Sequence, residues 1–443
     1  MTEQQKETEQ QTEQAGIPQY DFIKEQIKER PLNKKKLLRR TIITASMAVL
    51  FGLVACLTVL ILEPVFSNWL YPEEIAENIT FPPETEEMLP EDMALDDEEL
   101  EQEQEKEERP EIIPKEEDDE LNRYRKTFRE MQELAAEVSK SLVTVTGVTS
   151  DKDWFDNTYE SKGQTTGVIV ASNNREYLIL TDAEPLKTVE TINVTFCEDT
   201  QVQAEIKMTD PITGLAVLSI DSKLLGSDVL DGITTANLGS SNYAALTGSP
   251  VIALGSPAGM SGSIMYGVVT SGGNTLNTVD SKYKLITTDM YGSQSSTGVL
   301  VNLQGQIIGI IEQDYNDSQM KNMIAAFGIS ELKNTIERLS NGIEQAYIGI
   351  YGTDVTEEAN ENLQVPFGAY VTGIEMDSPA MQAGIQSGDV IVRLNGKEVG
   401  SYEEYISVLS ECIADSTVGI TIVRKNQEEY KSMNLQITLG TLK

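Results

Sequence analysis

Short β-rich runs, each bounded by turn residues, fill the chain between Leu142 and Glu312 and restrict its fold more than any other feature. They form two successive sets: LVTVTGV, TTGVIVA, YLILT, INVTF and GLAVLSI, then SPVIALG, MYGVVTS, YKLITTD, VLVNL and QIIGIIE. Many short strands at such spacing are typical of β-barrels and β-sandwiches. The regular alternation of helices and strands that indicates a Rossmann-like sheet is not seen. We therefore expect a mostly β domain built in two halves.

Helical segments are expected on both sides of these strands. In the first segment, Asn122–Ser141, apolar residues recur at helical spacing: Phe128, Met131, Leu134 and Val138. A second segment, Ser330–Ser340, follows the last strand. The sequence thus predicts one domain over residues 122–341 and a further unit over residues 345–443.

An uncharged run, Thr41–Leu62, precedes the folded part. It has about the 20 residues that a helix needs to cross a hydrocarbon core about 30 Å thick, so we predict a transmembrane helix. A buried core helix rarely runs this long without a polar face. A cleaved signal peptide is disfavoured because the run is too long and no small-x-small site precedes Glu63-Pro64. The basic cluster Lys34–Arg40 then places the N-terminus in the cytoplasm and everything after Glu63 outside.

Two polar segments flank this run. Residues 1–40 are rich in Gln and Glu and are predicted to form a disordered cytoplasmic tail. Residues 63–121 are predicted to form an acidic disordered linker. Between Glu73 and Glu120 there are 23 acidic and 3 basic residues, so this stretch carries 20 of the 37 net negative charges. A solvated spacer is the simplest interpretation of such a charge run, and a specific binding tail is the alternative.

Composition excludes several classes of function. A net charge of −37 argues against nucleic acid as a partner, because phosphate binding needs clustered Lys and Arg. The three cysteines, Cys56, Cys197 and Cys412, are widely separated and indicate neither a disulfide framework nor a metal site. The chain has no histidine, which excludes imidazole zinc sites and histidine general bases. We predict no metal and no cofactor.

A set of motifs occurs in a fixed order along the two β-rich halves. They are TGVIV and LTDAE at 166–170 and 180–184, DPITGLAVL at 210–218, VIALGSPAG at 251–259, Thr288-Asp289, SSTGVLVN at 295–302, Gly305, and IIGI at 307–310. Together they resemble the HtrA (DegP-like) family of trypsin-fold serine proteases. The resemblance implies a double β-barrel, with Glu184 in the position of the catalytic histidine, Gly214 in that of the aspartate, and Ser296 in that of the nucleophile.

Two of these three positions have lost the chemistry that the resemblance implies. A serine hydroxyl becomes a useful nucleophile only when a positioned base takes its proton. A carboxylate with an ordinary pKa of about 4.3, such as that of Glu184, is too weak a base unless burial raises its pKa. Gly214 has no side chain to orient a base. Loss of the histidine alone costs on the order of 10⁶ in turnover in a related constellation, so the sequence predicts an inactive protease domain.

The loop around the serine has changed as well. Gln294 stands where the family has a glycine two residues before the nucleophile, and Thr297 and Val299 replace the glycine and proline that follow it. A preorganised pair of N–H donors for an oxyanion is therefore not expected. Ser296 is predicted to be an ordinary loop serine. The alternative is a weak or unconventional endopeptidase in which Ser296 uses Glu184 or Lys187 as its base.

The C-terminal unit carries a more complete signature. It contains SPA at 378–380, AGI at 383–385, GDVI at 388–391 and LNG at 394–396. This pattern resembles HtrA-type PDZ domains. The resemblance implies that Tyr347, Ile348, Gly349 and Ile350 form the loop whose N–H groups hold the terminal carboxylate of a peptide. Residues 402–409 are then expected to form the helix beside that groove, with core packing as an alternative role for their apolar side chains.

The favoured hypothesis is a membrane-anchored, catalytically inactive HtrA-like protein that binds peptides or protein C-termini outside the membrane. It would act as a scaffold or regulator in cell-envelope protein quality control, with an active protease or an envelope protein as a further partner. Members of the family often assemble as trimers. The resemblance therefore also implies, as an alternative role, a homotrimer assembled through the barrel domain.

Overall fold

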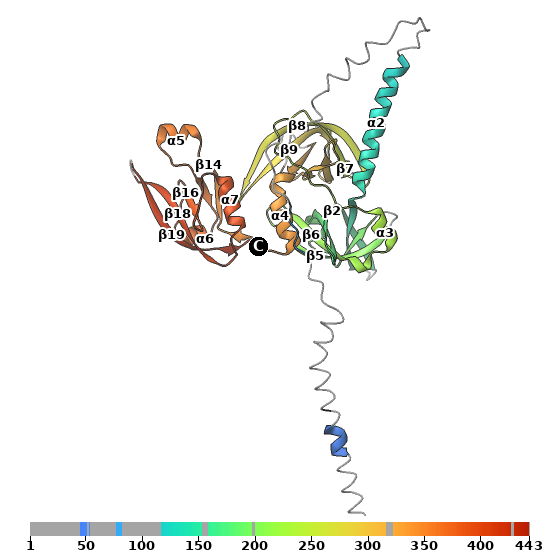
Figure 1. Cartoon of the computed structure of the whole chain (residues 1–443), viewed down its shortest axis with the longest axis horizontal. Helices are drawn as coiled ribbons and strands as arrows, with labels where there is room; N and C mark the ends of the chain where they lie inside the picture. The colour runs from blue at the N-terminus through green and yellow to red at the C-terminus, as the bar shows by residue number, and fades with distance from the viewer. Residues whose placement is uncertain are drawn as a thin grey trace, which may run out of the picture. The chain divides into compact units, whose positions relative to one another are not determined.

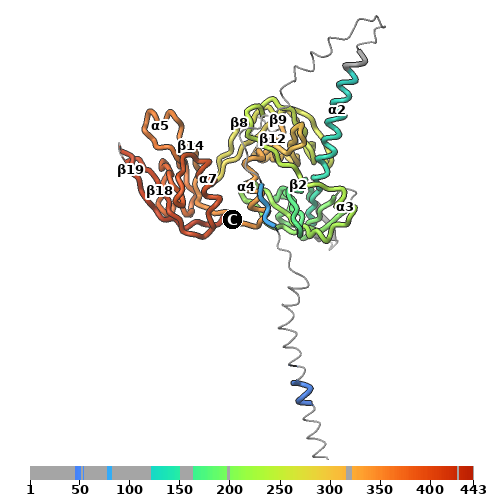
Figure 2. Tube along the Cα trace, in the orientation of Figure 1, coloured from blue at the N-terminus to red at the C-terminus, as the bar shows by residue number. Residues whose placement is uncertain are grey.

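The computed structural model describes residues 45–50, 53, 77–81, 117–152, 158–196, 200–315, 322–426 and 429–442. Residues Glu74–Lys443 form one compact unit. In chain order this unit contains a helix, two closed β-barrels, a second long helix and a smaller C-terminal domain (Figures 1 and 2).

The first barrel is closed by six strands in the order β1-β2-β3-β6-β5-β4. They are β1 (Leu142–Lys152), β2 (Thr158–Ser172), β3 (Glu176–Asp182), β4 (Thr191–Thr195), β5 (Gln201–Thr209) and β6 (Leu215–Asp221). The short 3₁₀ helix η2 (Glu184–Leu186) follows β3, and η4 (Ser222–Leu224) and α3 (Ser227–Gly232) follow β6.

The second barrel repeats this arrangement with the order β10-β11-β12-β9-β8-β7. Its strands are β7 (Pro250–Ser256), β8 (Ser263–Thr278), β9 (Ser281–Tyr291), β10 (Thr297–Val301), β11 (Ile307–Ile311) and β12 (Met323–Gly328). The two-barrel architecture expected from the sequence is confirmed.

Several strands read as unbroken apolar runs because both of their faces are buried. Successive side chains of a strand point to opposite faces. In β3, Ile179 packs inside the first barrel, whereas Leu178 and Leu180 join a core shared by the two barrels. In β11, Ile308 lies inside the second barrel and the adjacent Ile307 joins the shared core. The shared core packs the barrels against each other.

All ten predicted β-runs coincide with strands of the structure, but two strands were not predicted. In β5 (QVQAEIKMT) only Ala204 is buried, so its sequence has neither an apolar run nor a clear alternation. In β12 (MIAAFG) small residues are buried between neighbouring strands, and Ala and Gly are uncommon in strands. Tertiary contacts rather than local preference hold both segments in the barrels.

Two helices pack on the barrels. Helix α2 (Glu117–Ser139) begins before the expected Asn122 and places Met131, Leu134 and Val138 against the shared core. Helix α4 (Ile329–Asn341) buries Leu332, Ile336 and Leu339 completely, and it ends at Gly342 in the left-handed conformation.

The C-terminal domain is a β-sheet with helices against it and has a separate hydrophobic core. The sheet has the order β14-β15-β16-β18-β19, with β17 paired to β16, and β13 pairs with β20. Its strands are β13 (Ala346–Tyr347), β14 (Ile350–Asp354), β15 (Ala369–Ile374), β16 (Val390–Leu394), β17 (Lys397–Glu398), β18 (Thr417–Asn426), β19 (Glu429–Thr438) and β20 (Gly440–Thr441). Its helices are α5 (Glu357–Leu363), α6 (Pro379–Ala383) and α7 (Tyr402–Ser410).

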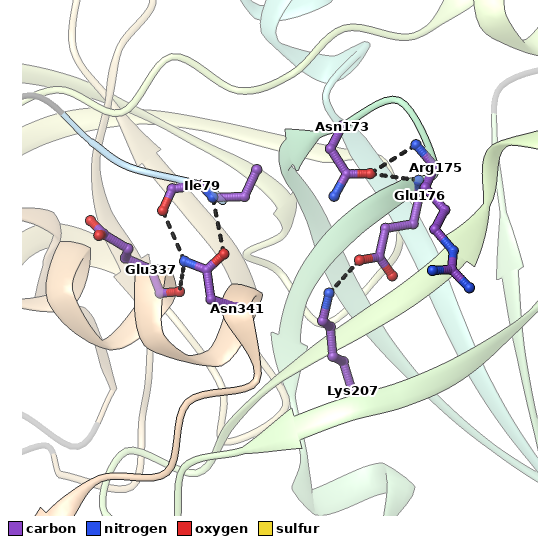
Figure 3. A network of polar contacts seen from close by, with 7 residues as sticks. All are labelled: Ile79, Asn173, Arg175, Glu176, Lys207, Glu337 and Asn341. Atoms are coloured by element: carbon purple, nitrogen blue, oxygen red, sulfur yellow. Dashed lines mark hydrogen bonds and ion pairs between the residues drawn. The ribbon is translucent and has the colours of Figure 1, made fainter. Parts of the chain in front are cut away.

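A short piece of the predicted acidic linker lies against α4 (Figure 3). The Asn341 side chain accepts a hydrogen bond from the Ile79 N–H at 3.0 Å and donates one to the Ile79 carbonyl at 2.9 Å. Ile79 and Phe81 pack against the shared core. Residues 77–81 therefore belong to the packed unit, whereas most of residues 63–121 lie outside the described part of the chain.

On the surface of the first barrel, Figure 3 also shows the Asn173 side chain accepting hydrogen bonds from the N–H groups of Arg175 and Glu176, and Lys207 pairing with Glu176.

Only part of the predicted transmembrane run lies among the described residues. Residues 45–50 and 53 are helical, and the rest of Thr41–Leu62 and the tail 1–40 lie outside them. No helix within the described residues is both long and apolar enough to cross a membrane.

Candidate functional site

The two barrels bring the predicted catalytic positions to one cavity of about 140 Å³. Glu184 lines it from the first barrel and Ser296 from the second. Gly214 adjoins it, because the N–H of Ala183 donates to the Gly214 carbonyl at 2.8 Å. The volume is below the roughly 300 Å³ at which ordinary ligand pockets begin. The motifs therefore meet in space as the resemblance implies, around a small site.

Glu184 faces solvent rather than a buried serine. Its side chain is 68% exposed and is paired with Lys187, one turn further along the chain. This hydrogen bond raises the pKa of Lys187, so the ammonium group stays protonated at neutral pH. Lys187 therefore cannot take the proton of Ser296, and the carboxylate of Glu184 is already paired with Lys187.

Gly214 occupies a backbone conformation that suits glycine. Its φ is +73°, in the left-handed region, and its N–H donates to the Asp210 carbonyl at 3.0 Å. The nearby Asp210 does not replace the missing aspartate. Its carboxylate accepts hydrogen bonds from the Thr213 N–H and hydroxyl and pairs with Arg338 at 2.9 Å. It therefore stabilises the turn before Gly214.

The hydroxyl of Ser296 is tied to the backbone. It is 3% exposed, donates to the Pro257 carbonyl at 2.5 Å, and accepts a hydrogen bond from the Ser293 N–H at 2.8 Å. The Ser296 N–H, which would serve an oxyanion, instead donates to the Ser293 carbonyl at 3.0 Å. The proton of the hydroxyl is thus used by Pro257, which follows β7, and the backbone donor is used within the Ser293–Ser296 loop.

Carboxyl groups that were not predicted as site residues line the same cavity: Asp182, Glu312 and Asp314. Burial, with a contribution from Asp182 and Asp314, raises the pKa of Glu312 to about 7. Burial also raises the pKa of Asp182. Within the described residues, no group of three or more metal-ligating side chains is arranged to hold a metal ion. The cavity is thus acidic, and the serine proton is directed away from its carboxyl groups.

The loop that was predicted to bind a carboxylate, residues 347–350, requires glycine at position 349. Gly349 has φ +90°, and a Cβ there would lie 2.3 Å from the Cβ of Ser378. The N–H groups of Ile348, Gly349 and Ile350 converge on one point, and the carboxylate of Asp280 from the second barrel occupies it. Nothing in the sequence pattern signals this contact. It joins residues that lie 68 to 70 positions apart.

Comparison with known proteins agrees with this arrangement. A family model described as a trypsin-like peptidase domain matches residues 165–310, and a PDZ-domain model matches residues 346–435. In both domains the chain is similar to HtrA proteins. It is 27% identical over 336 residues to the serine protease Do-like HtrA of Bacillus subtilis, covering 69% of this chain and 72% of that protein. It is 29% identical over 328 residues to HtrB of the same organism, covering 67% and 69%.

A probable periplasmic serine endoprotease, DegP-like, of Pseudomonas putida is 27% identical over 294 residues. That match covers 65% of this chain and 58% of the relative. Among solved structures, the HtrA-type protease AlgW with a decapeptide superimposes with a TM-score of 0.51 at 22% identity, covering 70% of this chain and 98% of that one. AlgW with a tripeptide gives 0.51 at 20% identity, covering 71% and 97%. These structures share the fold of this chain.

Proposed function

We propose that this HtrA-like chain is a pseudoprotease whose working site is its PDZ domain. The observation that carries the proposal is the hydrogen bonding of Ser296, whose hydroxyl donates to the Pro257 carbonyl in a chain without histidine. A serine without a base contributes little to peptide hydrolysis. The exposed, paired Glu184 and the absence of a side chain at Gly214 support the same conclusion.

The PDZ domain is proposed to bind peptides or protein C-termini through Tyr347, Ile348, Gly349 and Ile350. Three consecutive N–H groups of this loop converge on a carboxylate, which is the chemistry of a peptide terminus. Two similar solved structures hold a decapeptide and a tripeptide, which supports a peptide as the class of ligand.

The place of action is proposed to be the outer face of a membrane. The uncharged run Thr41–Leu62 after the basic cluster Lys34–Arg40 supports a single-pass anchor with the folded unit outside. Relatives named as periplasmic proteases support an extracytoplasmic location. In that setting the chain would act as a scaffold or regulator in protein quality control, with an active protease or an envelope protein as partner.

Labelling with a fluorophosphonate probe tests whether catalysis has been lost. The unit Glu74–Lys443 and its Ser296→Ala variant are incubated with the probe and, separately, with unfolded casein, beside trypsin as a positive control. We expect no labelling and no cleavage above background in either form, because the serine proton has no base. Labelling or cleavage that disappears in Ser296→Ala would instead establish the alternative, a weak endopeptidase using Ser296.

A further inference from the structure

The turn between β8 and β9 of the second barrel packs against the PDZ domain. Asp280 lies in this turn, is 1% exposed, and has φ +50°. Its N–H donates to the carbonyl of Ile350, the first residue of β14, at 2.8 Å. The left-handed region is unfavourable for residues other than glycine, although Asp tolerates it better than most. The contact with β14 holds the turn in this conformation.

The carboxylate of Asp280 accepts four hydrogen bonds, and all four donors belong to the PDZ domain. One oxygen accepts hydrogen bonds from the N–H groups of Ile348 at 2.7 Å and Gly349 at 2.6 Å. The other accepts from the Ile350 N–H at 3.1 Å and from the Tyr405 hydroxyl at 2.7 Å. Burial raises the pKa of this carboxyl, whereas these four donors act in the opposite direction. Such a buried carboxylate depends on its donors.

Asp280 therefore makes the contacts that the last residue of a bound peptide would make. A peptide added to the edge of β14 would place its terminal carboxylate on these three amides and pair its backbone with the strand. Asp280 offers its carboxylate to these three amides and its backbone N–H to the Ile350 carbonyl. We propose that Asp280 is an internal ligand of the carboxylate-binding loop, and that a protein C-terminus reaches this loop by displacing the β8–β9 turn. This inference rests on the proposed function of the PDZ domain.

Two further contacts hold the turn, one on β14 and one on α7. Lys282 in β9 pairs with Asp354 at the end of β14 at 3.1 Å. The Tyr402 hydroxyl in α7 donates to the carbonyl of Thr278, the last residue of β8, at 3.4 Å. The turn therefore contacts both β14 and α7, the two elements that the PDZ resemblance places beside a bound peptide strand.

Hydrogen exchange of the full chain in detergent micelles tests the internal ligand without any peptide. In Asp280→Asn and Asp280→Ala, we expect the segment covering residues 347–351 to exchange about tenfold faster or more, because its amides lose the carboxylate. Protection of β18 should be unchanged, which shows that the PDZ domain remains folded. Asp415→Ala is the matched control, since Asp415 is exposed and its backbone also lies in the left-handed region, with φ +60°. Equal exchange in the wild type and both Asp280 variants would overturn the proposal.

Peptide binding to the same full-length proteins tests displacement. The probe is a pool of fluorescein-labelled octapeptides ending in Val, Leu, Ile or Phe, prepared as free acids and as amides. We expect both Asp280 variants to bind the free acids about tenfold more tightly or more than the wild type and Asp415→Ala do. Equal affinities, with free acids still preferred, would overturn the internal ligand and leave the proposed function standing. Faster exchange in the Asp280 variants, together with no peptide binding by any of the proteins, would support Asp280 as the internal ligand. It would overturn the proposed function of the PDZ domain as a peptide-binding site.

Discussion

Glu312 is the carboxyl group of the cavity whose charge changes near neutral pH. It follows β11 and accepts a hydrogen bond from the Asp314 N–H at 3.0 Å. Burial, with the nearby Asp182 and Asp314, raises its pKa from 4.5 to about 7. The folded protein therefore binds a proton at this site more tightly than the unfolded chain does. The stability that results is fully present below pH 4.5 and is lost as the pH rises through 7.

Replacing Glu312 by Gln should remove this pH dependence. The amide keeps an oxygen for the Asp314 N–H but cannot ionise. We expect Glu312→Gln to match the wild type in free energy of unfolding at pH 5 and to exceed it by about 2 to 3 kcal/mol at pH 8. Urea unfolding of Glu74–Lys443 across this range measures the difference. The exposed Glu205→Gln is the control, and parallel curves for Glu312→Gln and wild type would contradict the assignment.

The residues of the candidate site were predictable only where a motif marks them. Ser296, Glu184 and Gly214 were placed by runs of neighbouring residues, and the structure brings their elements to one cavity. Glu312 and Asp280 were not found, because their roles come from groups that other strands place beside them. The proposal of an inactive site rests on the sequence in part, since the absence of histidine is visible there.

Helix α4 connects the turn before Gly214 to the shared core. Its Arg338 pairs with the buried Asp210, which holds the turn before Gly214. The helix itself was predicted within one residue at each end, because its apolar residues recur at helical spacing and Gly342 stops it. The ion pair could not be predicted, because Asp210 and Arg338 are 128 positions apart.

Breaking this ion pair should destabilise the barrels. Removal of one partner leaves a buried charge without compensation, so we expect Arg338→Ala to lower the free energy of unfolding by about 3 to 5 kcal/mol. Lys140→Ala, which removes the exposed Lys140–Glu137 pair, should change it by less than about 1 kcal/mol. Urea denaturation followed by circular dichroism compares the two variants. Equal small effects would show that Asp210 does not depend on Arg338.

At the scale of the whole molecule, the sequence predicts a membrane anchor and the folded unit begins soon after it. The described residues 77–81 are already packed on α4, so the chain between the predicted span and the folded unit is residues 63–76. Docking of Ile79 on α4 therefore leaves fewer residues between the predicted span and the first packed segment than a linker reaching to α2 would have.

Protease protection of the full chain in sealed, right-side-out membrane vesicles tests the anchor and its orientation. Proteinase K added outside should remove a C-terminal tag and leave an N-terminal tag on a protected fragment that ends near Leu62, because Lys34–Arg40 favours the cytoplasmic side. Changing the five basic residues of this cluster to Gln should weaken the preference and expose the N-terminal tag in part of the population. Detergent should abolish protection in both proteins. Loss of the N-terminal tag with survival of the C-terminal one would reverse the orientation, and digestion of both tags in sealed vesicles would rule out a span at Thr41–Leu62.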